Sequence, residues 1–430
     1  MRVVVTGAYG LIGAQVVAHL RARGDEVVGS GRDIATAARR FVGMEWVAID
    51  LARAPQSAWE AVLGGADAVV NCAGALQDGP RDDLEALHVE GVRRLVAACR
   101  TRGVRRFVHV SAAGVVPEGT TAFNRTKLAA EAAIRATELD WVILRPGFVL
   151  APVAYGGSGL LRGLAGFPFL TPLVHAESVV QVVSAHDLAE AVGRALAPDA
   201  PARITVDLVH GEETTLGAIV PEIRRWLGLP HAPTLHLPGA VARLSAGVAD
   251  ALARLGWRSP MRRTTLEQLR MGVRGDGGAA GRLLGLRLAS LREILDRWPA
   301  GVQERWYARL YFLKPAVLVG LGLFWLLSGL IGLMRVLEAT AILTAAGVAP
   351  LAATAAVVGG AAVDIALAVA LAVRRRARAA LVGMIVVSAG YLFGGTLLRP
   401  DLWADPLGPF LKIVPAALLA AAALATLDER

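Results

Sequence analysis

The sequence opens with MRVVVTGAYGLIGAQVVAHLRAR (residues 1–23), and this stretch decides the fold. Residues 1–6 form an apolar run typical of a short buried strand, and residues 14–23 have the mixed polarity of an amphipathic helix. Between them lies GAYGLIG (residues 7–13), with a glycine at every third position. A strand, a glycine turn and a helix in this order make up the phosphate-binding unit of dinucleotide-binding folds.

Each glycine of this segment has a separate task in such a fold. Gly7 allows the sharp turn, Gly10 allows backbone to approach a pyrophosphate, and Gly13 lets the helix pack close to the strand. The first amides of the helix and its positive dipole end then bind the phosphates. We therefore expect the following residues to contact a dinucleotide: Gly7, Tyr9, Gly10, Leu11, Ile12 and Gly13.

The composition indicates a membrane part at the C-terminal end. Hydrophobic residues make up 55% of the 430 residues, mean hydropathy is +0.51, and the apolar excess lies after Leu310. The net charge is +9, and residues 254–309 alone hold 12 arginines against 5 acidic residues. A basic segment beside a membrane segment favours anionic lipid headgroups. No recognisable nucleic-acid-binding motif accompanies the charge, which argues against a nucleic-acid partner.

The two cysteines, Cys72 and Cys99, give neither a disulfide framework nor a metal-ligand spacing. We therefore expect no metal site and a reducing, cytosolic environment for this part of the chain. The first residues already read as a strand, so no cleavable signal peptide is expected.

The residues after the second strand (26–30) bear on the choice of cofactor. Arg32 lies 19 residues beyond Gly13, and Asp33 lies 20 beyond it. A guanidinium pairs with the 2′-phosphate of NADP, whereas a carboxylate accepts from the 2′-hydroxyl of NAD. We favour Arg32 and NADP(H), with NAD(H) as the alternative; a solvated turn charge is the remaining interpretation.

Further strands alternate with helices. The predicted strands are residues 45–49, 66–71, 106–110 and 141–144, and the predicted helices are residues 56–63, 83–100 and 123–136. This alternation predicts a doubly wound parallel sheet with helices on both faces, the Rossmann class of α/β fold. Ligands bind at the carboxyl ends of the strands in such sheets. We therefore expect cofactor contacts from the residues that follow the strands: Asp50, Leu51, Ala73, Gly74 and Ser111.

Several motifs together resemble the short-chain dehydrogenase/reductase superfamily. They are TGAYGLIG, the NCAG turn at 71–74, VSAAG around Ser111, KLAAE at 127–131 and LRPG at 144–147. The pattern is similar to the extended or atypical, NAD(P)H-binding and epimerase-like branch, whose members include membrane-associated accessory subunits of respiratory complex I. The resemblance covers about residues 1–300. It implies an NAD(P)-binding Rossmann domain at 1–150, then a small substrate lobe and a basic helical connector at 151–300.

One position departs from the family pattern. The family's acid–base pair is a tyrosine with a lysine four residues later; the phenol transfers the proton, and the lysine lowers its pKa and binds the nicotinamide ribose. Lys127 is present, but Phe123 stands at the tyrosine position. The resemblance implies that Ser111 and Lys127 serve catalysis, with Tyr155 as a further candidate donor. A solvated lysine and a strand-end serine are the alternatives, so cofactor binding is better supported than carbonyl reduction.

The region after residue 150 is less regular. Residues 156–166 are rich in glycine and predict a mobile flap over the cofactor. Residues 179–183 and 203–208 predict strands of the substrate lobe, and residues 216–227 a helix. His186 opens another predicted helix, where we interpret it as a capping or packing residue.

After Leu310 the composition changes to long apolar runs typical of a membrane domain. Four runs almost without charge predict membrane-spanning helices at about residues 314–334, 352–373, 379–398 and 408–427. The link at 374–378 carries four arginines, and the other two links carry one each. Arginine-rich links face the cytoplasm. We therefore expect a multi-pass protein of a bacterial-type inner membrane, with both termini and the nucleotide domain cytoplasmic.

The tail at 310–430 resembles the DoxX-like membrane domain, including GAAVD at 360–364. Asp364 is an acidic residue within a predicted span, where a carboxylate is costly in lipid. Either a proton or quinone site, or a structural hydrogen bond to another helix, would explain it.

Two functions fit these features. The first is a membrane-anchored oxidoreductase that delivers hydride from NADP(H) to a lipophilic acceptor, such as a quinone or an isoprenoid carbonyl. The second is a dinucleotide-binding sensor or assembly factor for a membrane protein complex, without turnover. Phe123 favours the second, whereas Lys127, Ser111 and the substrate lobe favour the first.

Overall fold

The computed structural model describes residues 1–79, 82–257 and 259–427. The chain forms two compact units, which we call the α/β unit (Met1–Asp250 with Ser259–Ala308) and the helical unit (Ala251–Arg258 with Arg309–Arg430). Each unit is described below by itself.

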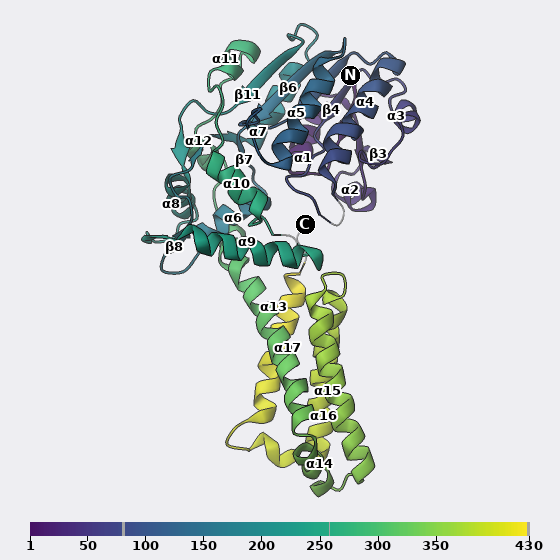
Figure 1. The fold of residues 1–430 in the computed structure, drawn as a ribbon, viewed down its shortest axis with the longest axis vertical. Helices are drawn as coiled ribbons and strands as arrows, with labels where there is room; N and C mark the ends of the chain where they lie inside the picture. Colours follow the sequence, from purple (N-terminus) through teal and green to yellow (C-terminus); the bar gives the residue numbers. More distant parts are fainter. Residues whose placement is uncertain (80–81, 258, 428–430) are drawn as a thin grey trace. The chain divides into compact units, whose positions relative to one another are not determined.

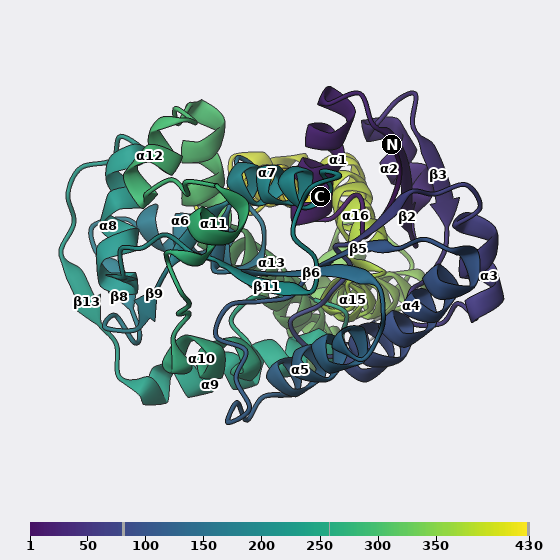
Figure 2. The ribbon, with the colours of Figure 1, turned by 90° about the horizontal axis from the view of Figure 1, so that it is seen from above.

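Seven parallel strands form the central sheet of the α/β unit, in the order β11-β6-β5-β4-β1-β2-β3 (Figures 1 and 2). The strands are β1 (Arg2–Thr6), β2 (Glu26–Gly31), β3 (Glu45–Ala48), β4 (Ala68–Asn71), β5 (Arg106–Val110), β6 (Asp140–Pro146) and β11 (Ile204–Leu208). The doubly wound sheet expected from the sequence is confirmed. Because the strands are parallel and in register, Thr6 lies beside Asn71, and Asn71 beside His109, at one edge.

One predicted strand belongs elsewhere than expected. Residues 203–208 were assigned to the substrate lobe, but β11 pairs with β6 and completes the main sheet. The pairing buries Val206 and Leu208 in the main core, and an apolar pattern alone does not name the sheet that a strand joins.

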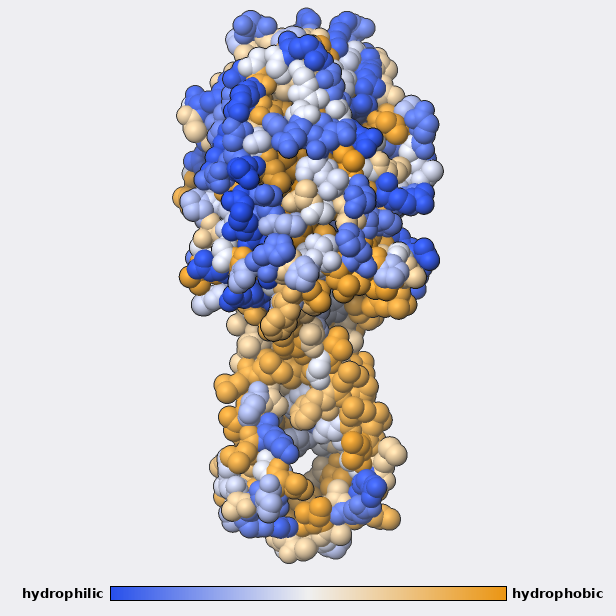
Figure 3. All heavy atoms as spheres, turned by 90° about the vertical axis from the view of Figure 1, so that its left-hand side faces the viewer, coloured by the Kyte–Doolittle hydropathy of each residue, from blue (hydrophilic) through white to orange (hydrophobic). Residues whose placement is uncertain are grey.

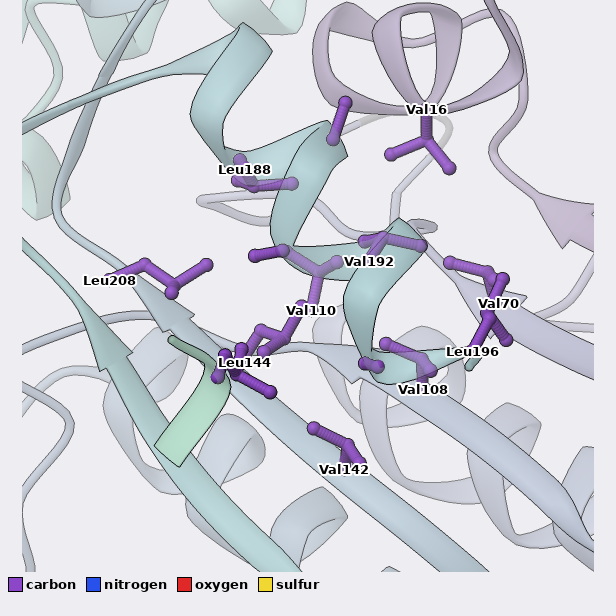
Figure 4. Close-up of a cluster of buried hydrophobic side chains, with 14 of the residues drawn as sticks. Val16, Val70, Val108, Val110, Val142, Leu144, Leu188, Val192, Leu196 and Leu208 are labelled. Atoms are coloured by element: carbon purple, nitrogen blue, oxygen red, sulfur yellow. The ribbon is translucent and has the colours of Figure 1, made fainter. Parts of the chain in front are cut away.

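Helices cover both faces of the sheet because the side chains of each strand alternate. Val3 and Val5 belong to the core cluster that includes residues of α1 (Leu11–Ala22) and α7 (Ala185–Ala195). Figure 4 shows part of this cluster, with Val16 of α1 and Leu188, Val192 and Leu196 near the strand residues Val70, Val108 and Val110. Val4 packs on the other face, which is covered by α3 (Gln56–Val62), α4 (Gly91–Arg102) and α5 (Ala122–Arg135). Each fully buried valine or leucine contributes about 1.5–3 kcal/mol by leaving water, so the two cores hold the strand ends firmly in place.

Two segments differ from the sequence-based expectation. The helix predicted at 83–100 is a π-helical turn, η1 (Glu85–Glu90), followed by α4. Residues 156–166 form the helix α6 (Gly156–Ala165) and not a flap. In α6, Leu160 and Leu161 are buried, and the Arg162 guanidinium donates to the carbonyls of residues 151 and 152. These tertiary contacts outweigh the low helix propensity of glycine.

The rest of the α/β unit is a smaller lobe built on short strand pairs. Its strands are β7 (Phe148–Leu150), β8 (Thr171–Leu173), β9 (Val179–Val180), β10 (Val182–Ser184), β12 (Thr214–Thr215) and β13 (Thr234–His236). Its helices include α8 (Leu216–Trp226), α10 (Arg263–Met271) and α12 (Leu291–Asp296), whereas α11 (Ala279–Leu284) packs into the main core. Two further helices are α2 (Ile34–Arg40), which follows β2, and α9 (Gly239–Arg254), which precedes α10. At the start of α7, Ser184 is the cap and His186 is exposed, whereas buried Asp187 bonds Arg297 at 2.7 Å.

The described residues of the helical unit form five apolar helices. They are α13 (Val302–Met334), α14 (Val336–Ala345), α15 (Pro350–Ala372), α16 (Ala377–Leu398) and α17 (Pro409–Ala425), with a short 3-10 turn, η2 (Pro400–Trp403), before the last. By length and composition α13, α15 and α16 can cross a membrane. Only 17–22% of the most apolar 18-residue segment of each helix is buried. Apolar side chains therefore lie largely at the surface of these helices, and they cover much of the face of the helical unit that Figure 3 shows, which is the pattern of a lipid-facing protein.

The last helix, α17, is shorter than expected, and α14 was not expected. The carbonyl of Leu427 accepts from Arg374 in the link between α15 and α16, at 2.9 Å, and from Lys314 on α13, at 3.4 Å. The end of α17 therefore returns to the arginine-rich end of the unit. Of the four predicted spans, three have the length and composition to cross a membrane in the described part of the chain, and α17, with 17 residues, is a shorter apolar helix.

Candidate functional site

The glycine turn after β1 has the geometry that a pyrophosphate needs. Gly7 lies in the left-handed region at φ +62°, and a Cβ there would press on the backbone of Ala73. Gly10 is the cap of α1, and a Cβ at Gly13 would overlap the carbonyl oxygen of Gly7. Since the cap has no side chain, the amides of residues 11–13 at the start of α1 remain available for phosphate oxygens.

Tyr9 serves the loop after β2. Its phenol oxygen accepts the backbone N–H groups of Arg32, at 3.1 Å, and Asp33, at 3.0 Å. Its ring packs near Trp46, with centroids 6.2 Å apart, and a Cβ at Gly31 would run into it. Tyr9 thus fixes both candidate ribose-recognition residues beside the glycine turn.

The loop after β2 is charged at Arg32, beside the glycine turn. The Arg32 guanidinium bonds the Asp82 carboxylate at 2.9 Å, and its side chain is 44% exposed. A 2′-phosphate would therefore compete with, or add to, the Asp82 contact. Asp50 accepts the N–H of Ala52 at 3.1 Å, and Leu51 is buried, so the structure shows loop-forming roles for both. Their contacts with adenine stay predictions.

Three buried polar side chains on neighbouring strands hold the turn after β4. Thr6 Oγ1 donates to Asn71 Oδ1 at 2.5 Å, and the Asn71 amide lies 3.0 Å from His109 Nδ1. The Ala73 N–H donates to both Thr6 Oγ1 and Asn71 Oδ1. Because Asn71 Oδ1 accepts twice, its NH₂ donates to His109, and the histidine proton lies on Nε2. This row positions Ala73 and Gly74 at the sheet edge.

His88, in η1, braces the same turn from the helix side. Its Nε2 accepts the Ala75 N–H at 3.2 Å, so Nδ1 carries the proton and donates to Thr126 Oγ1 at 2.9 Å. Burial, helped by the charge of Lys127, lowers the pKa of His88 to about 2. His88 is therefore neutral at physiological pH with both ring nitrogens engaged, and it cannot replace a missing proton donor.

Lys127 reaches the strand ends from α5 and is only 4% exposed. Its Nζ donates to the Val110 carbonyl at 3.0 Å and lies beside Gly74, where an added Cβ would be 3.4 Å away. Burial lowers the pKa of Lys127 to about 8, against the opposing effect of the Glu131 carboxylate, so the group is charged at neutral pH. An ammonium has three N–H donors. Among the described residues only Val110 accepts one, which leaves two for ribose hydroxyls.

Ser111 belongs to a buried ion network. Its Oγ donates to Glu131 Oε1 at 2.5 Å. Glu131 is fully buried and also pairs with Arg135, at 2.7 Å, and Arg145, at 2.6 Å. Glu131 thus accepts from two guanidinium groups and from Ser111, and the serine proton is directed to this carboxyl group and not to a substrate oxygen. A catalytic role for Ser111 stays a prediction.

Within the described part of the site, neither Phe123 nor Cys72 supplies the expected proton donor. The Phe123 ring packs edge-on against His88, with centroids 5.9 Å apart and planes at 77°. Tyr155 caps a different helix, α6, and is 36% exposed; its role stays a prediction. Beside the β4 turn, burial raises the pKa of the Cys72 thiol to about 12, so it supplies no thiolate nucleophile.

From the sequence alone, no role in the site was assigned to Glu131 or His88. Glu131 carries a usable signal, since its spacing of four from Lys127 places both on one face of α5. His88 has no local signal, because its partner Thr126 lies 38 residues away in the chain.

Comparisons with known proteins agree with this division of the chain. Residues 7–192 match the NAD(P)H-binding family, and residues 322–421 match the DoxX-like family. The first match spans the glycine turn, the β4 turn and Lys127.

Two curated relatives are similar over nearly their whole length. Sterol demethylase protein B of Methylococcus capsulatus is 30% identical over 335 residues, which cover 71% of this chain and 99% of the relative. The 3-diazoavenalumate denitrifying reductase of a Streptomyces species is 32% identical over 308 residues, covering 60% of this chain and 96% of the relative.

Solved structures show the same fold at low identity. A short-chain dehydrogenase/reductase superfamily protein of Agrobacterium tumefaciens with bound NAD has a TM-score of 0.53 and 21% identity, covering 74% of this chain and 99% of that one. The UDP-glucuronic acid 4-epimerase of Bacillus cereus, in complex with UDP-glucuronic acid and NAD, has a TM-score of 0.52 and 18% identity, covering 73% and 100%.

Proposed function

Because the chain belongs to the NAD(P)H-binding, epimerase-like branch of the short-chain dehydrogenase/reductase superfamily and carries a DoxX-like domain, we propose that it is a membrane-anchored oxidoreductase acting on a lipophilic acceptor. The observation that carries this proposal is buried, charged Lys127 with two unused N–H donors beside the β4 turn. A relative named for a sterol reaction supports an apolar substrate, as does the apolar surface of the helical unit.

The side chains present limit the kind of acceptor. When bound, NAD(P)H would supply a hydride; the amides of α1 would hold its phosphates, and Lys127 would orient its ribose. Reduction of a simple ketone leaves an alkoxide that needs a proton, and Phe123 has none to give. A quinone leaves a delocalised and far less basic anion. The site therefore favours acceptors whose reduced form needs no strong acid nearby.

The test is an assay of the detergent-purified protein. Co-purified nucleotide and lipid are identified by mass spectrometry, and oxidation of NADPH and NADH is followed by absorbance with a short-chain quinone and with a simple ketone. We expect quinone-dependent oxidation well above the ketone rate. No oxidation with any acceptor, together with a firmly bound nucleotide, would contradict the proposal.

That second outcome would support a non-catalytic sensor or assembly factor. Two observations favour it: Phe123 replaces the family's tyrosine, and the Ser111 hydroxyl is committed to Glu131. Both leave nucleotide binding intact while removing groups that act on a substrate.

We further propose that the cofactor is NADP(H), recognised by Arg32. Replacing Arg32 with alanine should weaken NADPH binding by roughly 10- to 150-fold, the size of one charged hydrogen bond, and leave NADH binding nearly unchanged. The control is Arg53→Ala, an exposed arginine beyond Asp50. Equal losses for both cofactors upon Arg32→Ala would show that the guanidinium does not bind a 2′-phosphate.

We also propose that the arginine-rich end of the helical unit is cytoplasmic, in a bacterial-type inner membrane, with both chain termini on that side. In a background with Cys72 and Cys99 replaced by alanine, Arg376→Cys and Ala404→Cys place exposed cysteines in the links before α16 and before α17. We expect an impermeant thiol reagent to label Ala404→Cys from outside intact cells and Arg376→Cys only after lysis. Labelling of both from one side would rule out this topology.

A further inference from the structure

The helical unit contains one buried carboxyl group with two hydroxyl partners on other helices. Asp364 of α15 is 5% exposed. Its Oδ2 accepts from Ser328 Oγ of α13 at 2.9 Å, and its Oδ1 accepts from Tyr391 OH of α16 at 2.9 Å. We call these three residues the Asp364 cluster. It lies eight residues before the end of α15, about 12 Å at 1.5 Å per residue, and so within the apolar depth of a bilayer.

Glycines allow this cluster to form. A Cβ at Gly329 of α13 would meet the Ala361 carbonyl and the side chain of Asp364, and a Cβ at Gly360 of α15 would lie 3.0 Å from Tyr391 OH. The three helices therefore approach closely at the level of the carboxyl group. Asp364 is therefore buried by close helix packing and is not a polar residue at the surface.

The hydrogen-bonding capacity of the cluster is only partly used. Each carboxyl oxygen accepts one hydrogen bond, although it has two lone pairs, and both hydroxyls retain acceptor capacity. Ser328 is exposed and Tyr391 is 40% exposed, so both residues that bond buried Asp364 reach the surface of the helical unit. Within hydrocarbon no water satisfies such groups. At this depth, a polar group of a molecule dissolved in the membrane can serve as the hydrogen-bond partner.

The charges of the cluster select the class of that molecule. Among the described residues, no lysine, arginine or histidine contacts Asp364, so an anionic lipid phosphate has no attraction here. The free sites of the cluster are all acceptors, since both hydroxyl protons are donated to Asp364. The ligand must therefore donate a hydrogen bond, and a neutral hydroxyl group on a large apolar frame has both that donor and the necessary solubility. A steroid alcohol and a quinol share this chemistry.

We propose that the Asp364 cluster binds the hydroxyl group of a neutral membrane lipophile. That this lipophile is also the redox substrate rests on the function proposed above. The helical unit would then hold and concentrate the apolar molecule in the membrane, in addition to anchoring the chain.

The test uses the full-length protein in phosphatidylcholine nanodiscs with a diazirine-bearing sterol and, separately, a diazirine-bearing ubiquinol kept reduced. Affinity is measured by competition with the unlabelled compound, and cross-linked peptides are mapped by mass spectrometry. We expect cross-links on α13, α15 or α16 near the cluster for at least one probe. Tyr391→Phe and Ser328→Ala should each weaken that probe by about five- to tenfold, the effect of one lost hydrogen bond.

The controls separate binding from folding and from catalysis. Thr354→Val removes a hydroxyl of α15 that bonds only its own helix, at Pro350, and should leave the affinity unchanged. NADPH binding by each variant reports that the α/β unit is intact. If Tyr391→Phe and Ser328→Ala bind both probes like the wild type, the cluster is a helix clamp and the inference fails, even where NADPH oxidation persists. Cluster-dependent probe binding without NADPH oxidation would support the site and contradict the redox function instead.

Discussion

Replacing Phe123 with tyrosine is expected to raise the reduction of a simple ketone by about 10²–10⁴-fold, the usual contribution of a positioned general acid. Phe123 stands four residues before Lys127 on α5, and its ring packs edge-on against His88. A hydroxyl added to this ring would restore the phenol–lysine pair. Lys127 is charged at neutral pH, since its pKa is about 8, so it would lower the pKa of the new phenol and favour proton transfer.

The measurement is the rate of NADPH oxidation with a panel of ketones, for the wild type, Phe123→Tyr and the matched control Phe123→Leu. The leucine variant changes the ring without adding a proton, so its ketone rate should stay low. Quinone reduction should change much less in all three. A wild type that reduces ketones briskly, with no gain from Phe123→Tyr, would show that another group donates the proton. Tyr155→Phe would then be the next variant to assay.

Replacing Lys127 with methionine is expected to weaken binding of either nicotinamide nucleotide by roughly 10²-fold or more. The estimate corresponds to the loss of two charged hydrogen bonds to ribose, at about 1.5–3 kcal/mol each. The fold should survive, because methionine fills a similar volume and removes a charge whose burial is costly. The measurement is nucleotide affinity by fluorescence titration, with the melting temperature of the nucleotide-free protein as the check on folding.

The pH dependence gives a second readout for the same residue. With its pKa lowered to about 8, Lys127 is protonated below pH 8 and neutral above it. Nucleotide affinity of the wild type should therefore fall as the pH rises through about 8, and the affinity of Lys127→Met should not follow this curve. Lys412→Met, which removes a lysine of α17, is the control and should retain the wild-type profile. A wild-type affinity that is constant from pH 7 to 9 would contradict a charged hydrogen bond from Lys127.

The sequence alone was sufficient for the order of elements around the cofactor groove. GAYGLIG predicted the turn at which Gly7 adopts φ +62° and Gly13 packs on the Gly7 carbonyl. Backbone conformation and close approach are local requirements, and only glycine meets them, so they are visible in one segment. The long apolar runs likewise predicted the helical unit, because each helix must satisfy its own backbone in lipid.

The tertiary structure decided how the side chains of the site are used. Ser111 was expected at a substrate, but its hydroxyl is donated to Glu131, which is held by Arg135 and Arg145 from two elements. The glycine-rich segment after residue 155 forms a helix because its leucines pack into the core of the smaller lobe.

A sequence records which hydrogen-bonding groups exist and how far apart they are along one element. The partner of a buried group comes from whichever segment the fold brings within about 3 Å. For His88, Glu131 and Asp364 those partners lie on other helices or strands. Local spacing therefore determined the groove for the dinucleotide, and long-range packing alone decided which protons and charges remain free to act in it.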